Sequence, residues 1–351
     1  MANILYFGVD FSGSTAGQRA NAIKRLGHNV DIRDPYKAFG KTLESWMGHL
    51  HFRTGYRFMQ GAIVKYLNGV IQTLPFKPDL IWVDMGELFG PSALSALRKA
   101  NCPIVCYNVD DPTGPRDGNR FRSFIKSIPL YDIIAVVRKE TAKECEALGG
   151  KRVVHVFRSY DEEIHKPYPS VDDIPSEFRS DVVFIGTWMR YEKRDEFMLK
   201  LVERGVPLTI WGDRWQKSPH FEKLKSHWKG KALYGREYVA AIQGSKICLG
   251  MLSKGNRDLH TTRSLEVPFA GGLFCCERTS EHEELYRENV EAVFWSDADE
   301  CATKCIELLS DECRMENIRE AGMSRVRALK LGNEDVCNQI LSMVLPELVK
   351  K

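Results

Sequence analysis

Short apolar runs alternate with helix-like segments along nearly the whole 351-residue chain, and this alternation most constrains its fold. Apolar runs that are continuous, and not alternating with polar residues, are typical of strands buried on both faces of a parallel sheet. The pattern therefore predicts an α/β protein. Strands are expected at 3–8, 29–33, 79–84, 103–108, 132–137 and 152–157, then at 181–186, 207–211, 246–251, 273–276 and 292–295.

The alternation stops once, between residues 159 and 179, where three prolines and several acids occur without periodicity. Such a segment is typical of a linker. We therefore predict a first Rossmann-like domain over 1–165, a linker over 166–178, a second Rossmann-like domain over 179–330, and a C-terminal helix over 331–351 that returns to the first domain. A cleft between the two domains is expected. A long amphipathic helical region rich in aromatic residues is predicted at about 39–74.

Composition excludes several classes of protein. The hydrophobic content of 43% and charged content of 28% are those of a globular chain. The net charge of +3 is too small to indicate nucleic-acid binding by itself. No apolar run approaches the ~20 residues of a membrane span, and the N-terminus resembles a strand and not a signal peptide. The ten cysteines lack CxxC spacing, so we expect reduced thiols in a cytoplasmic protein without a structural metal site.

Ligands of parallel sheets bind beyond the carboxyl ends of the strands, so the polar residues that follow the predicted strands are the candidates for a site. In the first half, Gly13 and Ser14 lie in a Gly/Ser-rich loop, and Asp84 follows the third strand. Asp110 and Asp111 follow the fourth and could supply a general base or bind sugar hydroxyls. Tight turns are the alternative interpretation of each of these loops.

In the second half, Gly186 and Thr187 follow the first strand, with Arg190 and Arg194 close behind. Small residues at a helix start with flanking cations suit a diphosphate, although a solvated basic helix start has the same pattern. Two turns contain aromatic residues: one follows the next strand and could wall a base or a sugar, and the other precedes a helix and could present backbone groups to a nucleobase, although either aromatic ring could simply pack. The two turns are Trp211-Gly212 and Tyr234-Gly235.

The stretch 258–286 combines polar residues, a glycine pair and a short apolar run. Asp258 and Glu266 stand eight residues apart on either side of Arg263, a spacing that suits a ligand with hydroxyls and negative charge. Ordinary charges at a helix start are the alternative. After the apolar run, Thr279 or Ser280 is expected to cap a new helix.

Two motifs of the second half resemble the glycosyltransferase domain of CgeB-like proteins, within the GT-B group. They are Phe184-Ile185-Gly186-Thr187, and the run from Arg263-Ser264-Leu265-Glu266 to Gly271-Gly272 that is followed by Glu277-Arg278-Thr279 and Glu281. The similarity is closest over about 180–300. It implies a GT-B architecture of two Rossmann-like domains that face each other across a cleft.

The resemblance also implies roles for individual residues. Glu266, five residues before Gly271, would bind the donor ribose, and Arg263 would face the diphosphate with Arg190 or Arg194 as a second cation. Ser264 lies within the donor-binding motif. Asp258 stands where related enzymes often carry a longer Glu near the transferred sugar. Enzymes of this group generally need no metal.

The predicted function is therefore metal-independent transfer of a sugar from a nucleotide-sugar, most often a UDP-sugar, to an acceptor hydroxyl. Asp110 or Asp111 would be the base if the reaction inverts, and Gly13, Ser14 and Asp84 would lie on the acceptor side. The acceptor could be a glycan, a small molecule or, as in some phage enzymes, a modified base of DNA. A nucleotide-sugar epimerase of GT-B fold and a non-enzymatic sugar-binding protein are the alternatives. The oligomeric state is open.

Overall fold

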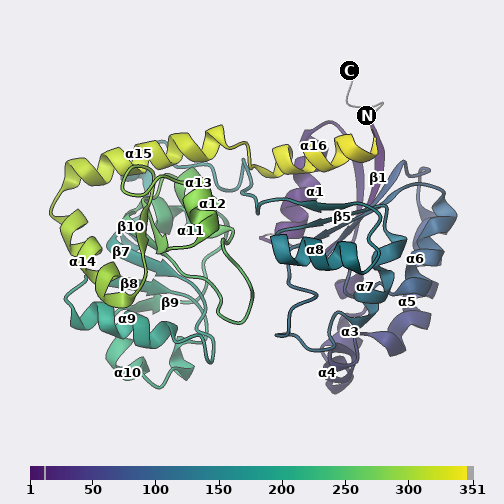
Figure 1. Cartoon of the computed structure of the whole chain (residues 1–351), viewed down its shortest axis with the longest axis horizontal. Helices are drawn as coiled ribbons and strands as arrows, with labels where there is room; N and C mark the ends of the chain where they lie inside the picture. The colour runs from purple at the N-terminus through teal and green to yellow at the C-terminus, as the bar shows by residue number, and fades with distance from the viewer. Residues whose placement is uncertain (12, 346–351) are drawn as a thin grey trace. The chain divides into compact units, whose positions relative to one another are not determined.

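A computed structural model describes residues 1–11 and 13–345 as two α/β units, each with a six-stranded sheet (Figure 1). One unit comprises Met1–Phe157 with the C-terminal segment from Asn333, and the other comprises Arg158–Gly332. All strand pairs within both sheets are parallel. The predicted fold class, two Rossmann-like sheets with covering helices, is confirmed.

The strands of the first unit are ordered β2-β1-β3-β4-β5-β6, and those of the second β12-β11-β10-β7-β8-β9. The first sheet is built from β1 (Asn3–Phe7), β2 (Asn29–Arg33), β3 (Leu80–Asp84), β4 (Ile104–Asn108), β5 (Ile133–Val136) and β6 (Val153–His155). The second is built from β7 (Ser180–Ile185), β8 (Leu208–Trp211), β9 (Trp228–Gly230), β10 (Ser245–Gly250), β11 (Phe274–Glu277) and β12 (Val293–Trp295). The short strand β9 was not predicted.

Helices flank both sheets (Figure 1). In the first unit they are α1 (Thr15–Arg25), α2 (Pro35–Ala38), α3 (Gly40–Leu43), α4 (Trp46–Arg53), α5 (Gln60–Thr73), α6 (Pro91–Leu97), α7 (Arg122–Ser127), α8 (Lys139–Ala147) and α16 (Asn333–Val344). In the second they are α9 (Arg194–Glu203), α10 (Phe221–Leu224), α11 (Gly235–Gln243), α12 (Arg263–Phe269), α13 (Ser280–Leu285), α14 (Ala298–Leu309) and α15 (Glu312–Ala328). Thr279 caps α13, as predicted, by accepting a hydrogen bond from the His282 N–H.

The predicted helical region at 39–74 is helical but broken into α3, α4, a 3₁₀ turn (Arg57–Met59) and α5. Ser45 caps a new helix start, and Gly55 and Tyr56 both adopt positive φ. Left-handed backbone cannot continue a right-handed helix, so amphipathic periodicity alone overestimated the length.

The C-terminal helix α16 packs against α1 within the first unit, where the two lie side by side (Figure 1). Val336, Ile340 and Leu341 of α16 are buried, and Glu334 pairs with Arg25 of α1. The predicted return of this helix to the first domain is confirmed. Residues 346–351 of the predicted C-terminal segment lie outside the described residues.

Residues 158–178 belong to the second unit, whereas the sequence placed the first domain's end at 165 and a linker after it. The ring of Tyr160 stacks on Phe269, with centroids 3.9 Å apart. His165 and Ile174 are buried in the same unit. Proline-rich composition does not reveal such packing, because the partner side chains lie far along the chain.

Candidate functional site

Neighbouring strands β7 and β10 lie where the strand order of the second sheet reverses direction. Chain connections leave opposite ways from the two strands at such a point, and this opens a crevice beyond their carboxyl ends. The loop after β7 carries Gly186, Thr187 and Arg190, and the loop after β10 leads through Asp258 to α12. The structure therefore gathers most of the predicted donor-binding residues around one end of the sheet.

Close backbone approach explains one of the predicted glycines, Gly212. A Cβ on Gly212, which has a φ of +148°, would lie 2.0 Å from the Gly186 carbonyl oxygen, and that oxygen accepts a hydrogen bond from Trp215 Nε1. Gly186 N–H donates to the Trp211 carbonyl. Arg194 donates to the Thr187 carbonyl at 2.8 Å, so this predicted cation organises the loop after β7.

A cavity of about 450 Å³ lies beside the same loop, and its lining includes three cations, Arg190, Lys193 and Lys217, and two acids, Asp195 and Glu196. Arg190 is exposed, and its guanidinium lies 5.4 Å from the Tyr191 ring centroid. Tyr191 and Lys193 both have positive φ, so the loop backbone is tightly curved. Lys193 lies 3.8 Å from Glu196, so Arg190 and Lys217 are the lining cations that could face an anionic group.

Glu266 and Arg263 share the short helix α12. The Glu266 carboxylate is nearly buried, and its Oε2 accepts a hydrogen bond of 2.8 Å from the Tyr238 hydroxyl. Among the described residues, no hydrogen bond reaches Oε1, because His165 Nε2 lies 3.7 Å away, too far for one. One carboxylate oxygen is thus fixed by the protein and the other can accept a donor.

Tyr238 and His165 are themselves held in place. Burial, together with the neighbouring Glu266 carboxylate, raises the pKa of Tyr238 well above its usual value, so its hydroxyl stays a donor. His165 Nδ1 accepts a hydrogen bond from the Asp161 N–H at 2.8 Å. This bond leaves the remaining proton of a neutral imidazole on Nε2, the nitrogen that faces Glu266.

Arg263 differs from most cations of the second unit. Its Nε is buried without a hydrogen-bond partner among the described residues, and no carboxylate lies within ion-pairing distance there. Its charge acts to lower the pKa of the neighbouring Tyr238 hydroxyl, against the larger effects of burial and of the Glu266 charge. A half-buried guanidinium without an anion is a ready partner for a bound anion, because it offers a planar fork of donors.

Asp258 lies in the loop after β10 and is largely buried. Its Oδ1 lies 3.3 Å from Arg158 Nη2, and its Oδ2 accepts from the Asn256 amide at 3.2 Å. The carboxylate is therefore already engaged with the protein. Of the two acids singled out by their spacing, Glu266 is the one with an open oxygen.

His260 was missed by the sequence interpretation. Its Nε2 accepts the Arg158 N–H at 2.9 Å, and its Nδ1 lies 2.6 Å from Glu281 Oε2. Burial lowers the pKa of His260, which agrees with a neutral ring. The residue positions the loop that holds Asp258, and only its place between Asp258 and Arg263 could have drawn attention to it.

Ser264, predicted on the donor side, is fully buried. Its hydroxyl bonds His282 Nε2 at 2.8 Å and accepts from the Thr261 N–H at 3.0 Å. Burial lowers the pKa of His282 to about 4, so the ring is neutral. The hydrogen bonds of Ser264 thus fix the start of α12.

The two aromatic turns behave differently. Trp211 packs against Phe178, with ring centroids 5.6 Å apart, and a Cβ on Gly230 would also meet it. Tyr234, by contrast, is 60% exposed, and Gly235 beside it has a φ of +53°. Trp211 therefore acts as packing, whereas Tyr234 presents its ring to solvent.

In the first unit the order reverses between β1 and β3, and the three acceptor-side candidates flank that point. Ser14 caps α1 by accepting from the Gly17 N–H and donates to the Val9 carbonyl. Gly13 has a φ of +103°. Asp84 is buried and accepts from Arg19 at 2.8 and 2.9 Å and from the Tyr6 hydroxyl at 2.7 Å.

The two predicted catalytic acids follow β4 and differ in exposure. Asp110 is partly exposed and lies 3.0 Å from Arg120 Nη1. Asp111 is buried and accepts from the Thr141 hydroxyl at 3.1 Å. The partly exposed Asp110 is better placed to meet a ligand.

Glu87 and Arg120 were not among the predicted site residues. The guanidinium of Arg120 pairs with Glu87, Asp110 and Asp117, and the Tyr36 hydroxyl donates to Glu87 at 3.0 Å. Burial raises the pKa of Glu87. The position of Glu87 after β3 was a usable signal, but nothing in the sequence connects it with Arg120.

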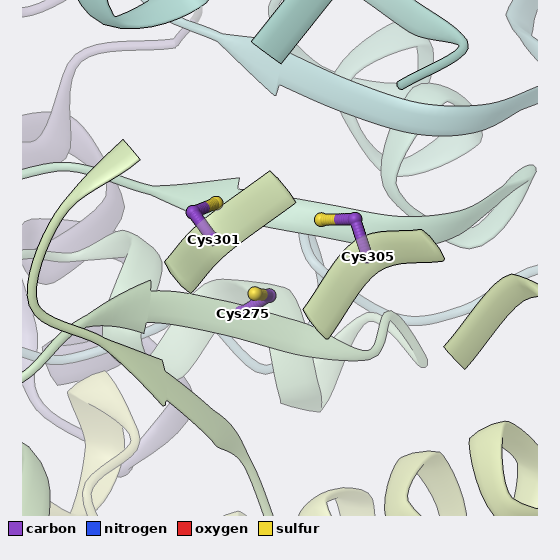
Figure 2. A group of neighbouring side chains, drawn as sticks. All are labelled: Cys275, Cys301 and Cys305. Atoms are coloured by element: carbon purple, nitrogen blue, oxygen red, sulfur yellow. The ribbon is translucent and has the colours of Figure 1, made fainter. Parts of the chain in front are cut away.

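Three sulfur atoms, those of Cys275 on β11 and of Cys301 and Cys305 on α14, lie within 4.8 Å of one another (Figure 2). This is the only group of three or more potential metal ligands found in residues 1–11 and 13–345. All three are fully buried in the apolar core of the second unit. Buried cysteines commonly pack as small apolar side chains, and a structural zinc site would need a fourth ligand. All ten cysteines, each within the described part of the chain, are free.

Part of the chain is similar in sequence to a known protein family. The family model described as "Glycosyl transferase-like" matches residues 192–339. No curated protein matches the chain.

Several solved structures match nearly all of it. A sucrose-phosphate synthase from Thermosynechococcus elongatus has a TM-score of 0.71 at 11% identity, with 100% of both chains covered. Anabaena HepE in complex with UDP and glucose has a TM-score of 0.65 at 13% identity, covering 98% of this chain and 99% of that one. A trehalose 6-phosphate synthase from Burkholderia multivorans has a TM-score of 0.65 at 11% identity, with 99% of each chain covered.

At these identities the solved structures show the fold, which is that of GT-B glycosyltransferases. The matched segment 192–339 includes β8 to α15 and all of α12, and it is glycosyltransferase-like in sequence. On these two findings the chain is an enzyme of the glycosyltransferase class with a GT-B fold. Within residues 1–11 and 13–345, no helix is long and apolar enough to cross a membrane.

Proposed function

We propose that this enzyme transfers a sugar from a UDP-sugar to an acceptor hydroxyl without a metal ion, as a CgeB-like member of the GT-B group. HepE, which has the same fold, is described in complexes with UDP and with UDP-glucose. The donor would bind the second unit beyond β7 and β10. The acceptor would be a glycan or another hydroxyl-bearing molecule bound by the first unit.

One observation carries the proposal: α12 presents an open carboxylate oxygen on Glu266 and a partner-free guanidinium on Arg263, one turn apart. A nucleoside diphosphate needs this combination. Its ribose hydroxyls can donate hydrogen bonds to a carboxylate, and its phosphates can accept hydrogen bonds from a guanidinium.

Arg263, with Arg190 from the loop after β7, would stabilise the negative charge that develops on the leaving diphosphate. Fixed donors aimed at developing charge are an effective source of rate acceleration, since they need not reorganise during the reaction. Both side chains are arginines and neither is paired with a carboxylate in the described structure. In this mechanism they perform the task that a divalent metal performs elsewhere.

Asp110 is our candidate for the group that receives the acceptor proton if the reaction inverts configuration. It is the more exposed of the adjacent acids, and Arg120 orients it from one side. Asp111, held by Thr141, is a positioning residue. If the reaction retains configuration, the same carboxylate would orient the acceptor hydroxyl.

Replacing Glu266 by Ala should weaken UDP binding about 10- to 100-fold. A hydrogen bond to a charged group contributes roughly 1.5–3 kcal/mol, and each 1.4 kcal/mol is a factor of ten in affinity. Isothermal titration calorimetry with UDP and with 2′-deoxy-UDP measures the effect. Wild-type protein should prefer UDP, and E266A should lose that preference because the ribose contact is gone.

Glu237→Ala is the matched control, since Glu237 is an exposed acid on α11 next to Tyr238. It should bind UDP as wild type does. Tyr238→Phe, which keeps the carboxylate and removes the hydrogen bond that fixes it, should give an intermediate loss. Equal UDP affinity of E266A and wild type would remove the ribose assignment.

Donor turnover should be unchanged after treatment with EDTA. If Arg263 and Arg190 supply the positive charge, chelation removes nothing that the reaction needs. UDP release from a UDP-sugar, followed before and after chelation and again with added Mg²⁺ or Mn²⁺, measures this. A strict requirement for a divalent ion would refute the metal-independent mechanism and leave the nucleotide-binding assignment standing.

A further inference from the structure

Helix α4 of the first unit has its apolar side on the outside. Trp46, Met47 and Leu50 are 79%, 41% and 45% exposed, while Gly48 and His51 are buried. A surface helix ordinarily turns apolar residues inward and polar residues outward. Positions 46, 47 and 50 share one helical face, so the exposed residues form a continuous stripe.

The inversion is built into the packing of the helix. A Cβ on Gly48 would lie 1.8 Å from the Leu43 carbonyl oxygen, so the inner face accepts only glycine there. Ser45 caps the helix start by accepting from the Met47 N–H, and a Cβ on Gly55, just after the helix, would meet Asn119 and Arg122. The helix therefore cannot rotate about its axis to bury its apolar stripe without losing these contacts.

Two further aromatic side chains close by in the sequence are exposed, Phe52 on another side of α4 and Phe58 in the 3₁₀ turn that follows the helix. Phe52 is 37% exposed and Phe58 61% exposed. We call the five residues Trp46, Met47, Leu50, Phe52 and Phe58 the α4 patch. Elsewhere in the described chain, the large exposed apolar residues are mostly scattered singly along the sequence, a pattern that needs no explanation.

Positive charge accompanies the α4 patch. Residues 37–58 contain four Lys or Arg residues and one acid, Glu44. Lys41, Arg53 and Arg57 are exposed, and no carboxylate pairs with them in the described structure. Arg122, also exposed, lies against Gly55. An occupant of this surface must therefore offer apolar contact and negative charge together.

We propose that the α4 patch docks the protein peripherally on an anionic lipid bilayer. Tryptophan and aliphatic side chains on one helical face, with phenylalanine, Arg and Lys nearby, are the chemistry of a helix that lies in the interface of such a bilayer. The basic residues meet the headgroups, and the aromatic rings enter at headgroup depth. Single-stranded nucleic acid would use the aromatic rings and cations, but it has no use for the aliphatic Met47 and Leu50.

Vesicle co-sedimentation of the full chain tests the proposal, and it needs no sugar donor, so the outcome does not depend on the proposed function. Wild-type protein should bind vesicles of equal phosphatidylglycerol and phosphatidylcholine, and bind pure phosphatidylcholine vesicles at least tenfold more weakly. Trp46→Ser with Leu50→Ser should lower the partition coefficient at least tenfold. Arg53→Gln with Arg57→Gln should lower it by about fivefold per charge removed.

Val290→Ser with Ile306→Ser is the control, since both residues are apolar and exposed, at 44% and 43%, but belong to the second unit. It should bind as wild type does. All replaced side chains are exposed, so thermal unfolding should change little. Three results would overturn the proposal: no binding of wild type to anionic vesicles; equal binding by W46S/L50S; or a dimer, or a complex with single-stranded DNA, that W46S/L50S abolishes while vesicle binding is absent.

Discussion

Arg263→Ala should lower the rate of donor turnover by about 10²- to 10³-fold, the loss typical of removing one preorganised group that stabilises charge in a transition state. Arg263 is a half-buried cation on α12, and no carboxylate pairs with it among the described residues. Removing it leaves no carboxylate without a counter-charge in the free enzyme, so the fold should persist. UDP affinity should also fall, whereas affinity for uridine, which lacks the diphosphate, should not change.

The difference between UDP and uridine distinguishes a diphosphate contact from general damage to the site. Arg263→Lys should restore only part of the rate, because an ammonium cannot form the bidentate fork. Arg287→Ala serves as the control, since Arg287 is exposed and pairs only with Glu291 in the described structure. A parallel loss of uridine and UDP binding in R263A would contradict the diphosphate assignment.

Asp84→Ala should cost about 3–5 kcal/mol of stability, because it leaves the Arg19 guanidinium buried without its counter-charge. The side chains of Arg19 and Asp84 are 5% and 1% exposed and joined by two hydrogen bonds. The Tyr6 hydroxyl loses its acceptor in the same substitution. Urea denaturation of wild type and variant measures the free energy of unfolding.

The exposed pair Lys246–Asp181 is the control for this experiment. Its atoms lie 2.7 Å apart, but its side chains are 55% and 42% exposed. Asp181→Ala should cost less than about 1 kcal/mol, since water screens exposed pairs. If Asp84→Ala proved as mild as Asp181→Ala, then Arg19 would have to find another partner, and the buried pair would not hold β3 to α1.

Sequence periodicity was sufficient for the architecture. The two series of apolar runs predicted two parallel sheets, and the strand ends predicted where polar residues would gather. Thr279 or Ser280 was expected to cap a helix, and Thr279 does so. Such features depend on residues within a few positions of each other, so a linear reading can identify them. The break after α4 was missed since it depends on left-handed backbone at Gly55 and Tyr56, within an amphipathic pattern that continues across it.

Whether each acid is already paired within the protein or free to bind a ligand could not be predicted from the sequence. Asp84, Asp258 and Glu266 were all candidate site residues, and nothing in the sequence shows which of their carboxylates are already paired. Arg19 neutralises Asp84 from 65 positions away, and Arg158 engages Asp258 from 100 positions away. Glu266 meets only a tyrosine hydroxyl and a distant imidazole, so one of its oxygens stays open.

The sequence alone thus determined the α/β class, the two-part organisation and the strand ends where a site would form, because hydrophobic periodicity and turn chemistry are local properties. Only the tertiary structure decided which side chains are available to a ligand. Burial, ion pairing and the facing of a helix such as α4 depend on partners brought together from distant parts of the chain, and these set the free energy of each polar or apolar group.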